Sequence, residues 1–250
     1  MGTSGGAVID YLLGAGTSGP VTLEILDARG SDVRSYKSDA PPEKVEARRY
    51  FTENWIRPPE VPGTSPGHHR FVWDLRYARP EAAEYDYTIA GVDGEETPIE
   101  PRGPLAVPGR YTVRLTAGAQ RLEQPLTVRP DPRISVAETV YADKLAMQQR
   151  VVAAMDSSFQ TLQAVRAYRK AHPSPTPTPT PAHGSGHAGP RDPVAVLETD
   201  LARSNRTLST ILNQLDAADA PATAAQAASL KTTLEALEAQ QKRWKELSGH

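Results

Sequence analysis

The chain has 250 residues, of which 38% are hydrophobic, so it is long enough to form two modest domains or one large one. Its 28 basic and 30 acidic side chains nearly cancel, which argues against nucleic acid or an anionic membrane surface as a partner. Cysteine is absent, and this excludes disulfides and thiolate metal sites. We therefore expect a soluble globular protein without a cofactor.

The first six residues, M-G-T-S-G-G at 1–6, are expected to be an artificial leader outside the fold. They do not combine a basic region with an apolar one, as a secretory signal does. No run in the chain reaches the ~18 apolar residues of a membrane-spanning helix. Insertion into a membrane is therefore not expected, and any export signal lies outside this chain.

The first half of the chain carries short segments that are typical of β-strands. Residues 7–13, 21–26, 33–36, 70–77 and 85–90 are rich in β-branched and aromatic residues, and turn residues separate them. Trp73 is expected to anchor the core of this region. The loop over 38–69 and the insertion that follows residue 90 are proline-rich, and a loop of such length is often functional or packed as a cover.

Residues 108–133 predict a β-hairpin that closes the β region. Tyr111, Val113 and Leu115 alternate with polar residues before a turn at residues 117–119. A second run follows the turn, with one apparent slip of register near Pro125. A tyrosine that enters a late strand after a Pro-Gly turn favours a tyrosine corner, in which the phenol bonds a nearby backbone group.

After Pro132 the hydrophobic period changes to that of a helix. We expect a long helix from 135 to about 171, a second from 193 with Asp192 as its N-cap, and a third opened by a Thr223–Gln226 capping box. The apolar stripe of the first helix is predicted to contain Tyr141, Leu145, Val152, Met155, Phe159 and Leu162. Phe159 and Trp244 are both expected in the core of the helices. Residues 172–191, rich in Thr-Pro, are predicted to form a flexible linker.

These patterns together predict an α+β chain of two domains. Residues 7–133 are expected to form an antiparallel β-sandwich of the immunoglobulin or fibronectin type III kind. Residues 134–250 are expected to form an antiparallel three-helix bundle that includes the linker.

Several segments together resemble the C-terminal region of bacterial BNR-repeat proteins, the sortilin-like and glycosyl-hydrolase-like β-propellers. The resemblance rests on G-A-V-I-D-Y-L-L at 6–13, V-T-L-E-I-L-D-A-R-G at 21–30, G-H-H-R-F-V-W-D-L-R-Y at 67–77, V-P-G-R-Y-T-V-R-L-T at 107–116, D-P-R at 131–133 and L-N-Q-L-D-A-A-D-A-P-A-T at 212–223. In that family the propellers hold any carbohydrate chemistry, and this region follows them. The resemblance implies a bacterial, extracytoplasmic protein, either secreted or periplasmic.

Candidate metal and acid/base residues have ordinary structural interpretations. His68 and His69 are adjacent on a strand and so point to opposite faces, while His183 and His187 lie in the linker, so no metal site is expected. A pair of carboxylates from Asp74, Glu81, Glu84 and Asp86 would suit a glycosidase. Charges between apolar strand positions are more typical of a solvated sheet face, and no catalytic residue is assigned.

The most plausible binding residues are aromatic and lie in or near the 38–69 loop. The candidates for an aromatic platform that stacks on sugar rings are Trp55, Arg57, Tyr77, Tyr85 and Tyr87, with Arg76 beside them. The alternative is that these side chains pack the loop against the sandwich.

No nucleophile elbow or phosphate-binding glycine loop is present in the sequence. We therefore expect a non-catalytic accessory module that supports or docks an upstream propeller through a protein surface. The alternatives are a carbohydrate-binding module that uses the loop aromatics, and a fragment of a glycoside hydrolase.

Overall fold

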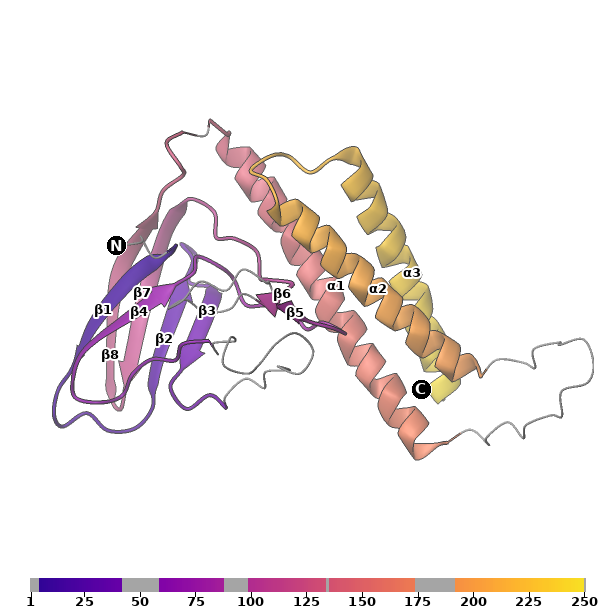
Figure 1. Ribbon diagram of the computed structural model, residues 1–250, viewed down its shortest axis with the longest axis horizontal. Coiled ribbons are helices and arrows are strands. Elements are labelled where there is room, and N and C mark those ends of the chain that lie inside the picture. The colour runs from indigo at the N-terminus through magenta and orange to yellow at the C-terminus, as the bar shows by residue number, and fades with distance from the viewer. Residues whose placement is uncertain (1–4, 42–58, 88–98, 134, 174–191, 250) are drawn as a thin grey trace, which may run out of the picture. The chain divides into compact units, whose positions relative to one another are not determined.

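The computed structural model describes residues 5–41, 59–87, 99–133, 135–173 and 192–249 (Figure 1). By its internal contacts the chain forms two compact units. The first, here called the β unit, comprises Met1–Arg79, Tyr85–Gln148 and Asp216–Pro221. The second, the helical unit, comprises Pro80–Glu84, Gln149–Leu215 and Ala222–His250. The described residues thus form an α+β structure, with antiparallel sheets and three helices.

The β unit contains a larger and a smaller antiparallel sheet around one core. The smaller sheet pairs β1 (Ala7–Leu13) with β4 (Gly67–Trp73). The larger sheet has the order β3-β2-β7-β8, formed by β2 (Val21–Leu26), β3 (Asp32–Lys37), β7 (Gly109–Ala117) and β8 (Gln120–Val128). A separate short ladder joins β5 (Asp86–Tyr87) to β6 (Ile99–Glu100), which the sequence did not predict.

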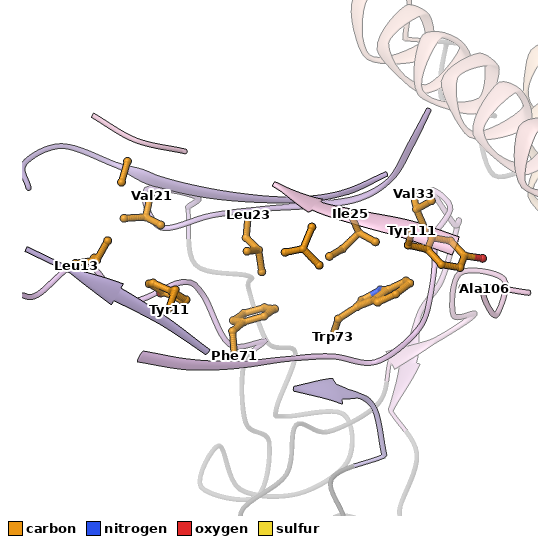
Figure 2. Close-up of a cluster of buried hydrophobic side chains, with 12 residues drawn as sticks. Tyr11, Leu13, Val21, Leu23, Ile25, Val33, Phe71, Trp73, Ala106 and Tyr111 are labelled. Atoms are coloured by element: carbon orange, nitrogen blue, oxygen red, sulfur yellow. The ribbon is translucent and has the colours of Figure 1, made fainter. Parts of the chain in front are cut away.

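The core of the β unit lies between these two sheets. Figure 2 shows Phe71 and Trp73 of β4 turned toward the apolar side chains of β2 and β7. Trp73 is fully buried, as predicted, and its ring meets that of Tyr111 edge to face at 5.6 Å. Its Nε1 donates to the carbonyl oxygen of Arg76 (3.0 Å), so burial leaves the indole N–H satisfied. Each large side chain buried here stabilises the fold by about 1.5–3 kcal/mol.

The predicted tyrosine corner is confirmed. The hydroxyl of Tyr111, near the start of β7, donates to the carbonyl oxygen of Val107 at 2.7 Å. Burial raises the pKa of Tyr111 to about 12, because the charged phenolate would lose its hydration. The bond fixes the chain just before it enters the strand.

The hairpin of β7 and β8 keeps one register throughout, so the predicted slip near Pro125 is wrong. The pairing runs without interruption from Gly109 and Val128 to Ala117 and Gln120. Gln124 faces Val113 in this ladder, and a polar residue at that position interrupted the apolar alternation. Because β8 is an edge strand of the described sheet, it tolerates both this exposed glutamine and a proline.

The strand predicted over 70–77 ends earlier, at Trp73. Leu75 adopts a left-handed backbone conformation with φ of 60°, which a strand cannot accommodate. The strand expected over 85–90 is described only as β5, because residues 88–90 lie outside the described part.

The long helix α1 (Glu138–Ala171) turns inward a face that matches the predicted one only in part, because Met155 and Leu162 are buried as expected but the other four residues are not. Tyr141, Leu145, Val152 and Phe159 are only half-buried. The buried positions follow a line that advances alternately by four and three residues and includes polar side chains: Lys144, Gln148, Val151, Met155, Ser158, Leu162 and Val165. Because three of these seven are hydrophilic, apolar periodicity alone selected a stripe that shares only Met155 and Leu162 with the buried line.

The helical unit contains the rest of α1 with α2 (Pro193–Asp216) up to Leu215 and α3 (Ala224–Ser248), and successive helices run antiparallel (Figure 1). Both predicted N-caps are confirmed. The Asp192 carboxylate accepts from the N–H of Val194 (2.9 Å), and Thr223 and Gln226 form the reciprocal capping box. Trp244 is half-buried rather than in the core, and its ring meets Tyr168 edge to face.

A buried amide holds one non-helical segment of the helical unit. Asn205 of α2 is 1% exposed, and its Nδ2 donates to Ser158 Oγ (2.8 Å) and to the carbonyl oxygen of Met155 (3.0 Å). Its Oδ1 accepts from the backbone N–H of Ala83 (2.7 Å), while the N–H of Glu81 donates to Asp156 Oδ1. The segment Pro80–Glu84 is therefore fastened to α1 and α2 by backbone hydrogen bonds.

Candidate functional site

The described part of the β unit contains a cavity of about 190 Å³. Its apolar wall is built by Leu75, residues 105–108 and Val128, which lie beside β4, before β7 and at the end of β8. Side chains from the first turns of α1 and from the segment after α2 complete it. Five separate stretches of the chain therefore converge on one small space.

Polar groups enter the cavity from α1 and from the segment after α2. Lys144 is 7% exposed, and its Nζ donates to the carbonyl oxygen of Ala218 and to Asp219 Oδ1, each at 3.0 Å. Gln148 lies one helical turn further along and is 1% exposed. Among the described residues, its Nε2 has no hydrogen-bond partner. A buried amide donor left in this way is unusual and destabilising.

The charges that line the cavity balance. Arg129 and Lys144 carry positive charge, whereas Asp131 and Asp219 carry negative charge. Asp131 is also bound by Arg133, whose side-chain hydrogen bonds lower the pKa of this carboxyl to about 2. The cavity therefore contains charged groups but has no excess of either sign.

A second ion pair braces the same segment that carries Asp219. Arg76 donates to both carboxylate oxygens of Asp216 at 3.1 and 2.9 Å, and also to the carbonyl oxygen of Gly103 at 2.9 Å. The two side chains are 15% and 27% exposed. Arg76, which we expected beside a sugar platform, is thus occupied by structural bonds.

The outer face of the β1-β4 sheet combines apolar and charged side chains. Leu12 is 75% exposed and Val8 46%, although both lie on one strand of a folded sheet. Between them, Asp10 accepts two hydrogen bonds from Arg70, at 2.9 and 3.0 Å. The bond from Arg70 holds the pKa of Asp10 below its ordinary value. This surface, defined by Val8, Asp10, Leu12 and Arg70, is here called the β1-β4 outer face.

The predicted aromatic residues are only partly described. Tyr77 packs against the hydrophobic core and its pKa is raised by burial, so its ring is not a free platform. The guanidinium of Arg79 lies over the ring of Tyr85, 4.6 Å from its centre. Tyr87 pairs with Ile99 through its backbone, and its side chain lies outside the described part, as do Trp55 and Arg57.

The other candidate residues are held by local structural contacts. The Asp74 carboxylate accepts from the backbone N–H of Arg76, and Glu84 pairs with Arg206. His69 stacks on Tyr11 and bonds the carbonyl oxygen of Ser65, while His68 lies 3.4 Å from Asp10. His183 and His187 lie outside the described residues.

Within the described ranges, no three His, Asp or Glu side chains are arranged to hold a metal ion. In the same ranges, no helix has the length and apolar character required to cross a membrane.

Sequence patterns did not predict the cavity. Its one sequence signal is the pair Lys144 and Gln148, two polar residues four apart that share the buried line of α1 with apolar residues. Polar side chains at such positions indicate a site or a buried bond partner.

Comparison with known proteins identifies no relative: no family model matches the chain, and neither a curated protein nor a solved structure is significantly similar to it.

Proposed function

We propose that this chain is a non-catalytic accessory module that supports or docks a β-propeller of a secreted BNR-repeat protein. The support is the resemblance of its segments to the region that follows such propellers, together with the β1-β4 outer face. Exposed apolar side chains beside an arginine–carboxylate pair are typical of a surface that contacts another protein. Leu12, at 75% exposed, is the observation that carries the proposal.

The experiment measures binding between this chain and the separately produced propeller region of the parent protein. Burying one leucine contributes about 1.5–3 kcal/mol, so Leu12→Ser should weaken binding by roughly tenfold or more. Leu122→Ser is the matched control, because Leu122 is also an exposed strand leucine (62%) but lies on β8. Equal effects of the two substitutions, or no binding by the unaltered chain, would contradict the proposal.

A second experiment tests the supporting role in the parent protein. Removing residues 7–250 should lower the solubility of the propeller when it is expressed alone. A propeller that remains fully soluble and folded without this region does not need its support.

We also propose that the β unit has the immunoglobulin or fibronectin type III topology. In support, β1 paired with β4 corresponds to strands B and E, and the order β3-β2-β7-β8 corresponds to C′-C-F-G. The hydroxyl bond of Tyr111 lies at the start of β7, the strand that would be F. An experimental structure in which β1 pairs with any strand other than β4 would remove this assignment.

The competing proposal is a carbohydrate-binding module. It depends on Trp55, Arg57 and the Tyr87 side chain, which lie outside the described residues, because Tyr77 and Tyr85 are already in contact with core or Arg79. A glycan array and affinity-gel retardation test it. Binding that is lost in Trp55→Ala with the fold intact would favour this function over the docking role.

The third proposal, a fragment of a glycoside hydrolase, has the least support. Asp74 and Glu84 are engaged in local bonds, and no catalytic pair is assigned. We expect no hydrolysis of a panel of aryl glycosides by this chain alone. Turnover that is lost in Asp74→Asn would overturn that expectation.

A further inference from the structure

We propose that the cavity of the β unit binds a small neutral molecule that has an apolar body and one carbonyl oxygen, such as a carboxamide. Gln148 would donate to that oxygen. This proposal is independent of the docking role, because that role rests on the β1-β4 outer face and no residue of β1 or β4 lines the cavity.

Gln148 brings an unsatisfied hydrogen-bond donor to the cavity. Gln148 lines the cavity, it is 1% exposed, and its Nε2 has no partner within the described residues. Native proteins rarely leave such a group unpaired, and an acceptor supplied by a ligand removes the penalty. The terminal torsion of glutamine has a broad energy profile, so the enclosed amide can turn its N–H toward a ligand.

The balance of charge in the cavity favours a neutral ligand. The cavity has two cationic and two anionic residues, and Lys144 is already bonded to Asp219 at 3.0 Å. A carboxylate ligand would compete with Asp219 for Lys144, and an ammonium ligand would approach Lys144 and Arg129. A neutral acceptor avoids both conflicts, because burying an unpaired charge is costly.

The size and polarity of the cavity favour a small ligand with an apolar body. Leu75, Leu105 and Val128 give the cavity a mainly apolar wall. About six waters would fill 190 Å³ at ~30 Å³ each, and an apolar wall gives them few bonds. Releasing such water to an apolar ligand favours binding. At the packing density of protein interiors, the space suits a ligand on the order of ten non-hydrogen atoms.

The test uses the intact chain and four probes of similar shape but different polar groups. These are cyclohexanecarboxamide, cyclohexanecarboxylate, cyclohexylmethylamine and methylcyclohexane. Binding is followed by the amide signals in nuclear magnetic resonance spectra. These include the side-chain NH₂ signal of Gln148, which is assigned as the signal that disappears in Gln148→Met. The carboxamide should bind with a dissociation constant of roughly 0.1–1 mM, as small ligands do, and should move that signal.

Two substitutions separate the proposed contact from general effects. Gln148→Met keeps the length and removes the donor, so it should weaken carboxamide binding about fivefold and leave methylcyclohexane binding unchanged. Gln149→Met is the matched control, because Gln149 is the next residue and is exposed, and it should change neither. Melting curves of both variants check that the fold is retained.

Three outcomes would overturn the proposal. One is that no probe shifts the signals of cavity residues, which would leave water as the only occupant. Another is that the charged probes bind as tightly as the carboxamide. The last is that Gln148→Met weakens the carboxamide and the hydrocarbon equally, which would mean that the amide has no specific role. None of these results bears on the Leu12 experiment.

Discussion

Arg76 and Asp216 are 140 positions apart in the sequence, yet they form two nearly parallel hydrogen bonds of 3.1 and 2.9 Å. The guanidinium also donates to Gly103, so one side chain joins three stretches of the β unit. Such a two-bond geometry is specific to arginine, because lysine presents a single point charge.

Substituting Asp216 should therefore destabilise the protein. Asp216→Asn leaves a largely buried guanidinium without its counter-ion, and we expect the free energy of unfolding to fall by about 2 kcal/mol. Urea denaturation measures the change. Asp200→Asn, in an exposed pair with Arg203, is the control and should change it by less than about 0.5 kcal/mol. Equal losses of stability in the two variants would mean that the Arg76–Asp216 pair contributes no more than an exposed ion pair.

The Tyr111 hydroxyl should matter both at neutral pH and in alkali. Tyr111→Phe removes the bond to Val107 and should lower the free energy of unfolding by about 1 kcal/mol at pH 7. The phenol's pKa is about 12 in the fold, against an ordinary 10.0. Its contribution is therefore complete below pH 10 and is lost as the pH rises through about 12.

The loss of stability in alkali is measured separately. Between pH 10 and 12 the native protein should lose up to roughly 2–3 kcal/mol through Tyr111, and the Tyr111→Phe variant should lose less. Urea midpoints at several pH values follow the difference. The idea is wrong if both proteins lose stability in parallel.

Removing the Asn205 amide should loosen the segment Pro80–Glu84. Asn205→Leu has a similar volume but cannot accept from Ala83, so we expect a loss of about 2–4 kcal/mol. Hydrogen exchange at the Ala83 amide should accelerate more than at amides inside α2. Thr210→Ala, at an exposed site of the same helix, should leave both quantities nearly unchanged.

Replacing Gln148 should raise the free energy of unfolding, whereas the substitutions of Asp216, Tyr111 and Asn205 should lower it. Gln148→Met removes a buried donor that has no partner among the described residues, and we expect the unliganded protein to gain about 1 kcal/mol. Thermal unfolding of Gln148→Met, compared with that of the control Gln149→Met, measures this gain in stability. A clear loss of stability would show that the Gln148 amide already has a partner in solution.

The sequence predicted the elements of the fold better than their inward faces. Val21, Leu23 and Ile25 alternate clearly, and the caps at Asp192 and Thr223 use local chemistry, so these features followed from neighbouring residues. The inward face of α1 did not, because Lys144 is buried by bonds to residues 218 and 219, which are 74 and 75 positions away. The hydrophobic periodicity of neighbouring residues cannot reveal contacts with such distant positions.

The candidate site was harder to predict for the same reason. The aromatic residues chosen from composition include Tyr77, which packs into the core, and Tyr85, whose ring lies under Arg79. The cavity arises only when five segments meet, and the left-handed Leu75 just after β4 forms part of its wall. Strain at a bulky residue of this kind is stored where the surrounding structure imposes it.

The segments that each unit takes from elsewhere in the chain limit how the protein can be dissected. A fragment ending at Arg133 would lack the Lys144 ammonium, the Gln148 amide and the Asp216 carboxylate, leaving Arg76 without its anion. The complementary fragment would lack Ala83, whose backbone N–H donates a hydrogen bond to Asn205 Oδ1. Expressing the halves separately should therefore give two weakened products, and mixing them should restore the missing bonds only if the fragments reassociate.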